Sequence, residues 1–174
     1  MDVLIVAATV RELGGRDGLA CGIGPVEAAA ATATVLAHQP PPAVLHVGLA
    51  GARSLAPPAL VLGSEAVYED LQASIPVVSY VEPDAALLAR VREALPEAHV
   101  LPIGTSARVG AASGCDIEAM EGFAVLRACA LAGVPAVELR AVSNAMGQVD
   151  RARWRVDEAL AALADAVTRV VAVV

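Results

Sequence analysis

Short hydrophobic segments alternate with longer helical patterns along the whole chain. The short segments are rich in β-branched residues and are bounded by glycine, proline or polar residues, which is typical of buried strands. The longer segments are rich in alanine and leucine. This alternation predicts βα units on a largely parallel sheet. The predicted strands are Val3 to Ala8, Leu19 to Cys21, Val44 to Gly48, Leu60 to Tyr68, His99 to Ile103 and Ala136 to Ser143.

Helix start and stop signals mark the segments between these strands. Pro25 suits a first turn, where its missing N–H costs nothing, and Asp84 can cap a second helix. Gly133, followed by Pro135, is the expected stop signal for a third. The predicted helices are Pro25 to His38, a helix that follows Asp84, about Met120 to Ala132, and a last helix from near Asp157.

Apolar residues at helical spacing define the buried faces of two of these helices. In the helix after Asp84, Arg90, Arg92 and Glu93 take the solvent face. The predicted fold class is therefore α/β, a single three-layer domain over residues 1–174 with a mixed, mostly parallel sheet flanked by helices. The predicted buried positions are Leu87, Leu88, Val91 and Leu95, and Leu160, Leu163, Val167, Val170 and Val174.

Hydrophobic residues make up 57% of the chain, yet they are interrupted too often for a membrane protein. A spanning helix needs roughly 20 predominantly apolar residues in succession, and none of the segments provides them. The N-terminal segment also lacks the basic region and small-residue cleavage site of a signal peptide. We therefore expect a soluble, cytoplasmic protein with no membrane partner.

Charge and cysteine usage exclude several classes of function. The 12 basic residues are all arginine and are scattered, and the net charge is −7, so no nucleic-acid partner is expected. A chain without lysine cannot be a Schiff-base enzyme or carry a Walker-type phosphate loop. Cys21, Cys115 and Cys129 are odd in number and show no CxxC spacing. They favour small buried hydrophobes over a disulfide framework or a metal site.

Polar residues stand where the predicted strands end, at the edge of an α/β sheet that usually binds ligands. Glu12 follows the first strand and is a candidate general base, although spacing alone favours a solvated first-turn glutamate stabilised by the helix dipole. Glu121 opens an apolar helix. Its carboxylate can accept two hydrogen bonds from a ribose diol, or it can be a helix N-terminal acid. Asn144 ends the last strand, where asparagine is also a common turn residue.

Glycines accompany two of these strand ends. Gly22 and Gly24 lack the third glycine of a dinucleotide fingerprint, because Glu27 stands in its place, so they favour a tight turn over a ligand loop. Gly48 to Ala52 is a second strand-to-loop transition whose glycines permit close backbone approach to a ligand. His46 has no partner nearby in the sequence, which favours a core histidine over a catalytic one.

Taken together and in this order, the segments resemble the purine nucleosidase branch of the nucleoside phosphorylase superfamily over nearly the whole chain. Met120-Glu121 is similar to the ribose-binding Met-Glu pair of that family, and Ser143-Asn144 is similar to the end of its purine-contacting strand. Glu12 falls where the methylthioadenosine/S-adenosylhomocysteine nucleosidases carry their water-activating glutamate. The resemblance implies substrate contacts from Leu49, Ala50, Met120, Glu121 and Ser143, and catalytic roles for Glu12 and Asn144.

Within this branch, the chain resembles the futalosine hydrolases most. Adenosine-type nucleosidases end the purine strand in Ser-Asp, whereas futalosine hydrolases have Ser-Asn, as at Ser143-Asn144. Other positions also resemble the futalosine hydrolases. They are Leu49, where adenosine-type enzymes have serine, the segment Ser64 to Leu71, and Asp150-Arg151 with Trp154. The resemblance implies release of hypoxanthine from futalosine in menaquinone biosynthesis, without metal or organic cofactor, by a homodimer. Asn144 by itself is also compatible with adenine, because an amide pairs with adenine N6 and N7.

The mechanism that the resemblance implies parallels inverting glycoside hydrolysis. Water held by Glu12 attacks C1′ from one face of the sugar while the purine leaves from the other. The chain departs from the family between Leu13 and Leu19, in a short loop after Ile103, and around Ala107 to Val109, where relatives often stack an aromatic ring on the purine. Trp154 is the candidate for the missing apolar face.

Three alternatives stay open at this point. A methylthioadenosine/S-adenosylhomocysteine nucleosidase would release adenine. A purine nucleoside phosphorylase would need a phosphate pocket, for which Arg11 and Arg53 are the only candidate arginines. A non-catalytic nucleoside-binding homologue would bind without turnover.

Overall fold

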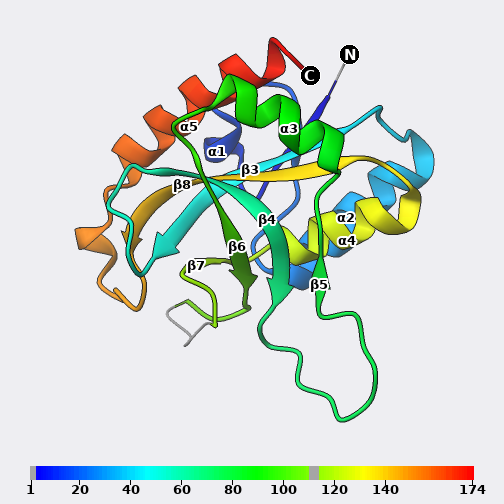
Figure 1. Cartoon of the computed structure of the whole chain (residues 1–174), viewed down its shortest axis with the longest axis horizontal. Coiled ribbons are helices and arrows are strands. Elements are labelled where there is room, and N and C mark those ends of the chain that lie inside the picture. Colours follow the sequence, from blue (N-terminus) through cyan, green and yellow to red (C-terminus); the bar gives the residue numbers. More distant parts are fainter. Residues whose placement is uncertain (1–2, 110–113) are drawn as a thin grey trace.

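The hydrophobic segments form the strands of one mixed sheet in the computed structural model, which describes residues 3–109 and 114–174. The arrangement of the elements is shown in Figure 1. The strands are β1 (Leu4–Ala7), β2 (Leu19–Ala20), β3 (Val44–Ala52), β4 (Leu60–Tyr68), β5 (Tyr80–Val81), β6 (His99–Thr105), β7 (Ile117–Ala119) and β8 (Ala136–Ala145). The helices are α1 (Val10–Leu13), α2 (Pro25–His38), α3 (Ala85–Ala94), α4 (Gly122–Ala132), the 3-10 turn η1 (Arg151–Arg153) and α5 (Val156–Val171).

Strand pairing confirms the mixed, mostly parallel sheet. β1 pairs in parallel with β2 and β3, β3 with β8, β4 with β6, and β6 with β7. The pairs β3–β7, β4–β5 and β4–β8 are antiparallel. Because β3, β8, β4, β6 and β7 pair around a closed circle, the middle of the sheet curls into a small barrel. Its interior holds a cluster of small and branched residues that includes Val61, Ile103 and Val142.

Helices cover the sheet on both sides, as the sequence predicts (Figure 1). On one side, α3 and α5 pack on β1, β3 and β8 through a core that includes Leu87, Val91, Leu163 and Val167. On the other side, α2 and α4 pack together over a second core around Leu126. None of the helices in the described ranges is both long and apolar enough to span a bilayer. That residues 1–174 make up a single domain stays a prediction.

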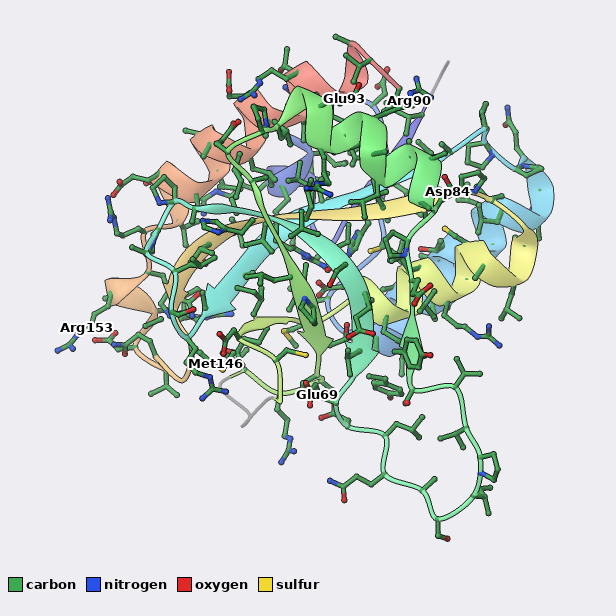
Figure 2. The ribbon with its side chains drawn as sticks, viewed as in Figure 1. Glu69, Asp84, Arg90, Glu93, Met146 and Arg153 are labelled. Atoms are coloured by element: carbon green, nitrogen blue, oxygen red, sulfur yellow. The ribbon has the colours of Figure 1, made fainter. Side chains whose placement is uncertain are left out.

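The helix signals are confirmed at their ends. Asp84 caps α3 by accepting a hydrogen bond from the Leu87 N–H at 2.8 Å, and Gly133 ends α4 with φ of 69°. Arg90 and Glu93 project from α3 away from the sheet in Figure 2, as the amphipathic pattern predicts. The last helix buries Leu163, whereas Leu160 is only half-buried.

Several elements differ from the sequence-based prediction. β3 does not end at Gly48 but continues to Ala52, because β7 and β8 pair with its second half from both sides. α4 begins at Gly122, and Met120 lies in the turn before it. Cys115 is partly exposed, unlike the other two cysteines. The short elements α1, β5, β7 and η1 were not predicted, because each is too short to show a periodicity.

A buried polar layer lies between the sheet and α4. Arg140, on β8, is 1% exposed, and its guanidinium donates from Nε to Glu138 at 2.7 Å and from Nη2 to the ring of His46. A Cβ on Gly48 would lie 2.2 Å from Arg140 Nη1, and a Cβ on Gly122 would lie 2.3 Å from both carboxylate oxygens of Glu138. Only glycine leaves room for these two charged groups.

His46 is held in this layer as a neutral ring. Its Nδ1 faces the carbonyl oxygen of Val6 at 3.0 Å and must donate to it, so Nε2 is left to accept from Arg140. Complete burial, together with the positive charge of Arg140, holds the pKa of His46 well below its ordinary 6.5. The sequence-based expectation of a core histidine is confirmed.

The neutral ring of His46 predicts a loss of stability in mild acid. The unfolded chain binds a proton at His46 as the pH falls below 6.5, whereas the folded chain does not. The free energy of unfolding should therefore decrease as the pH decreases below about 6.5, by up to about 1.4 kcal/mol per pH unit. Urea unfolding at a series of pH values between about 7.5 and 5.5 measures this slope.

The matched variants are His46→Gln, which keeps an acceptor but does not titrate, and His99→Gln at an exposed histidine. Burial raises the pKa of Glu138, despite the opposing effect of Arg140, and stability from that group is lost as the pH rises. The contribution of His46 is therefore measured as the difference between the slope of the wild type and the slope of His46→Gln, since both proteins contain Glu138. Equal slopes in these two proteins would contradict a neutral His46.

Candidate active site

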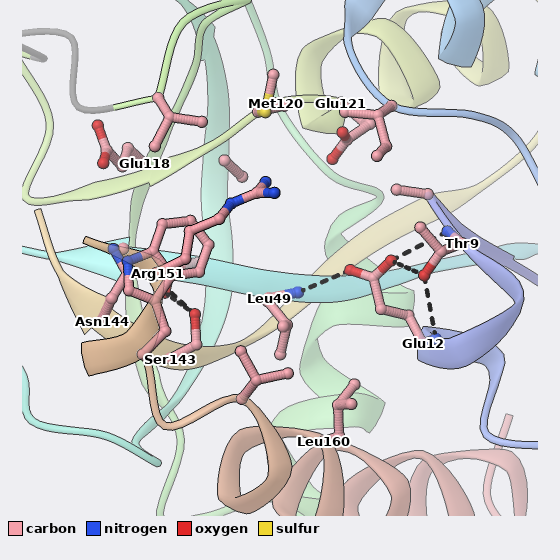
Figure 3. A pocket seen from close by; sticks show the side chains of 18 of the residues that line it. Thr9, Glu12, Leu49, Glu118, Met120, Glu121, Ser143, Asn144, Arg151 and Leu160 are labelled. Carbon is pink, nitrogen blue, oxygen red and sulfur yellow. Dashed lines mark hydrogen bonds between the residues drawn. The ribbon is translucent and has the colours of Figure 1, made fainter. Parts of the chain in front are cut away.

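A cavity of about 420 Å³ opens at the carboxyl ends of β1, β3 and β8, as in Figure 3. The turn between β7 and α4 closes one side, and η1 with the start of α5 closes another. Its size is in the range of small-molecule sites. The lining residues are Ala8, Thr9, Arg11, Glu12, Ile23, Leu49, Ala50, Gly51, Arg108, Val109, Glu118, Ala119, Met120, Glu121, Ser143, Asn144, Arg151, Trp154, Val156 and Leu160.

Glu12 is both a helix-capping residue and a cavity residue. Its Oε2 accepts hydrogen bonds from the N–H and the hydroxyl of Thr9 at 3.0 and 2.7 Å, which completes a capping box. Its Oε1 accepts from the N–H of Leu49 at 3.2 Å. These contacts fix the carboxylate, and the remaining lone pair of Oε1 is available to a bound molecule (Figure 3). The two interpretations of Glu12 from sequence are therefore compatible.

Glu121 lies across the cavity from Glu12, 4% exposed at the start of α4. Its Oε1 accepts from the N–H of Gly24 at 3.0 Å, and its Oε2 lies 3.5 Å from Arg140 Nη1. Burial by itself disfavours the charge of Arg140, but the carboxylates of Glu138 and Glu121 more than offset it and raise the pKa of Arg140. The buried guanidinium is thus a permanent cation beneath the cavity.

Asn144 presents a fixed amide at the other end. Its Oδ1 accepts from the hydroxyl of Ser143 at 2.8 Å, and its Nδ2 donates to the carbonyl oxygen of Ala145 at 3.0 Å. These contacts assign the oxygen and nitrogen of the amide. The second N–H of Nδ2 is the group that Asn144 can offer to a ligand. It suits an acceptor such as purine N7 or O6.

The rest of the wall is mainly aliphatic, with Leu49, Val109, Val156 and Leu160 among its residues. Trp154 is the one aromatic residue that lines it within the described ranges, and its Nε1 donates to the carbonyl oxygen of Gln148 at 2.8 Å. No aromatic residue lines the cavity from Ala107 to Val109, as the sequence already shows.

All eight residues that the sequence suggested for the site line this one cavity: Glu12, Leu49, Ala50, Met120, Glu121, Ser143, Asn144 and Trp154. Their individual roles stay predictions. The sequence reasoning missed Arg140, which it treated only as part of a strand, although a charged residue inside an otherwise hydrophobic strand is itself a signal. It also missed the apolar contributions of Ile23 and Val109 from loops.

The thiols and the candidate arginines offer little to a reaction. Burial raises the pKa of Cys21 to about 11 and that of Cys129 to about 12, so both are protonated at neutral pH. Arg11 lines the cavity but pairs with Asp157 at 2.6 Å, and Arg53 pairs with Asp116 at 3.3 Å away from the lining. In residues 3–109 and 114–174, no three His, Cys, Asp or Glu side chains group as metal ligands would.

Comparison with known proteins agrees with this geometry. The model of the phosphorylase superfamily matches residues 18–112. A futalosine hydrolase of Streptomyces coelicolor is 38% identical over 182 residues, which cover 88% of this chain and 77% of the relative. One from Thermus thermophilus is 34% identical and covers 88% of this chain and 80% of the relative.

Solved structures show the same fold. A futalosine hydrolase mutant of Helicobacter pylori superposes with a TM-score of 0.89 at 18% identity, over 98% of both chains. The methylthioadenosine/S-adenosylhomocysteine nucleosidase of Streptococcus pneumoniae, in complex with 8-aminoadenine, gives a TM-score of 0.87 at 20% identity, over 100% of both. Fold and sequence together show that this chain belongs to the phosphorylase superfamily and, within it, to the futalosine hydrolase family.

Proposed function

We propose that this protein hydrolyses the N-glycosidic bond of futalosine and releases hypoxanthine, with Glu12 activating the attacking water. The observation that carries the proposal is the position of Glu12. One carboxylate oxygen is fixed by Thr9, and the other faces the same cavity as Glu121 and Asn144. A base, a ribose-binding acid and a purine-binding amide are thereby available to one nucleoside.

Charge supports the expected transition state. Hydrolysis of an N-glycosidic bond places positive charge on the ribose ring as the base departs. The single positive charge of Arg140 faces Glu138 and Glu121, and Glu12 lies close enough to influence it. The site therefore keeps a surplus of negative charge around the ribose, which stabilises the transition state more than the ground state.

Glu121 and Met120 are proposed to hold the ribose, and Asn144 the purine. The carboxylate of Glu121 accepts hydrogen bonds from the ribose hydroxyls. The Asn144 amide donates to N7 or O6 of the base as charge develops there. Hypoxanthine delocalises that charge onto O6, so a donor that delivers no proton is sufficient. Leu49, Ala50 and Ser143 line the base end, and Trp154 is proposed to contribute its apolar face.

The alternatives are less well supported. A phosphorylase needs cations for phosphate, but Arg11 is already paired with Asp157. The fold by itself does not separate the two nucleosidase activities, because a methylthioadenosine/S-adenosylhomocysteine nucleosidase and a futalosine hydrolase superpose with TM-scores of 0.87 and 0.89. The place of the reaction in menaquinone biosynthesis, which derives from the resemblance, and a cytoplasmic location are further proposals.

The first prediction of the proposed function concerns the products. Futalosine incubated with the protein should release hypoxanthine at a rate that does not depend on phosphate, and methylthioadenosine and S-adenosylhomocysteine should be poor substrates. Chromatography of the released base and of ribose 1-phosphate measures both. Adenine as the main product, or ribose 1-phosphate formed only with phosphate, would favour one of the alternatives instead.

The second prediction concerns Glu12. The substitution Glu12→Gln keeps the size of the side chain but removes the base, so kcat for futalosine should fall by roughly 10² to 10⁴-fold while the Michaelis constant changes little. The control is Glu93→Gln, at an exposed glutamate on α3, which should keep wild-type kcat. Undiminished turnover by Glu12→Gln would rule out its role as the base.

We also propose that the protein is a homodimer formed through the faces of α2 and α4. A shallow groove runs between these helices, and its residues are aliphatic or aromatic except for Arg127. Val26 and Leu131 on its rim are 77% and 71% exposed. A face of this kind is buried in homodimers, which are the commonest assemblies of soluble proteins. The groove residues are Pro25, Val26, Ala29, Ala30, Ala33, Leu36, Ala37, Pro40, Tyr68, Phe123, Ala124, Arg127, Ala128, Leu131 and Ala132.

The third prediction follows from this face. Sedimentation velocity should give twice the 17.6 kDa mass of the chain, and Val26→Arg should raise the dimer dissociation constant at least about tenfold by placing a charge in the interface. Val149→Arg is the control, since Val149 is equally exposed at 77% and lies outside the groove. A wild-type monomer at micromolar concentration would refute the dimer.

A further inference from the structure

Arg151 is a charged residue of the cavity that the proposed function leaves unused. It lines the cavity from η1, and Figure 3 shows it at the end that holds Ser143 and Asn144, away from Glu12. The segment is tied to that end, because the backbone N–H of Arg155 donates to the carbonyl oxygen of Ser143 at 2.8 Å. Arg151 therefore belongs to the part of the cavity where the base is proposed to bind.

The guanidinium of Arg151 is available to a ligand. The other two arginines that line the cavity, Arg11 and Arg108, form ion pairs with aspartates at 2.6 and 3.9 Å. Arg151 forms none with any described residue; instead its guanidinium lies over the ring of Trp154, 5.5 Å from the centroid. A cation–π contact uses the positive charge and leaves the N–H donors unused.

Trp154 restricts the position of this cation. Its indole N–H donates to the carbonyl oxygen of Gln148, and its backbone N–H donates to the carbonyl oxygen of Arg151 at 3.2 Å. The ring is thus held by the same turn that carries Arg151. A side chain of this length would otherwise sample many rotamers, so the contact reduces the entropy lost when the guanidinium binds a ligand.

A guanidinium can donate hydrogen bonds but cannot accept them. The O6 and N7 atoms of a 6-oxopurine are acceptors on adjacent positions, which arginine recognises with two N–H groups, whereas a 6-aminopurine places a donor at the first of them. The remaining N–H of the Asn144 amide is also a donor. Given that the site binds a purine nucleoside, we infer that Arg151 determines base specificity, favouring 6-oxopurines over 6-aminopurines.

The test compares binding of free hypoxanthine and free adenine, which have neither ribose nor tail. Arg151→Met keeps the length and the apolar stem but removes every donor. The dissociation constant for hypoxanthine should rise roughly tenfold to hundredfold, and that for adenine should stay unchanged or fall. Arg153→Met is the matched control in the same turn, because Arg153 pairs with Asp150 and does not line the cavity. Calorimetric titration gives the constants, and thermal unfolding confirms that both variants are folded.

Turnover provides the second measurement. The ratio of kcat/KM for futalosine to that for its 6-amino analogue should fall in Arg151→Met by the same factor as the ratio of base affinities. Equal weakening of both bases would overturn the inference, because it would mean stacking or a structural role. Loss of futalosine turnover with unchanged base affinities would overturn it too, because Arg151 would then contact the tail of the substrate. Absence of any hypoxanthine release by the wild type would refute the proposed function, while the base titrations would still test Arg151.

Discussion

The buried guanidinium of Arg140 is the group on which the centre of this structure depends. It links β8 to β3 through His46 and to the start of α4 and the cavity through Glu121, and within β8 it pairs with Glu138. A cation that is 1% exposed is tolerated only with such compensation, since an unpaired buried charge costs several kcal/mol. The requirement that each partner stay in place therefore connects the packing of the sheet to the geometry of the site.

Most of the fold could be predicted from sequence because its long elements carry a clear periodicity. The strands of the parallel part and helices α2, α3 and α5 were identified close to their observed bounds. The extension of β3 through Gly48 to Ala52 could not be predicted in the same way. A stretch of glycine and alanine looks like a loop locally, and only the strands that pair with it on both sides make it a strand.

The sequence predicts the site less completely than it predicts the fold. Local spacing left Glu12, Glu121 and Asn144 with two interpretations each, and only the resemblance to a family brought them together. The fold explains how these residues come to line one cavity, because the carboxyl ends of the parallel strands β1, β3 and β8 lie at the same edge of the sheet. Arg140 was not predicted, since its role lies in contacts with residues that are distant in sequence. No one-dimensional pattern reports that Glu138, two residues earlier, and Glu121 pair with the same guanidinium.

The scarcity of aromatic residues changes how such a site can hold a base. Only 2% of the chain is aromatic, and within the described residues Trp154 is the one ring that lines the cavity, so stacking, which tolerates any purine, is limited to this ring. Directional hydrogen bonds must supply more of the binding energy, and they do so only from fixed donors. Ser143 fixes the amide of Asn144, Thr9 fixes the carboxylate of Glu12, and the ring of Trp154 restricts the guanidinium of Arg151. In each pair, the two residues belong to the same strand end, turn or helix cap. Local backbone geometry therefore sets the orientation of the hydrogen-bonding group, and long loops are not needed for it. Selectivity for the base is then a consequence of how the site achieves affinity.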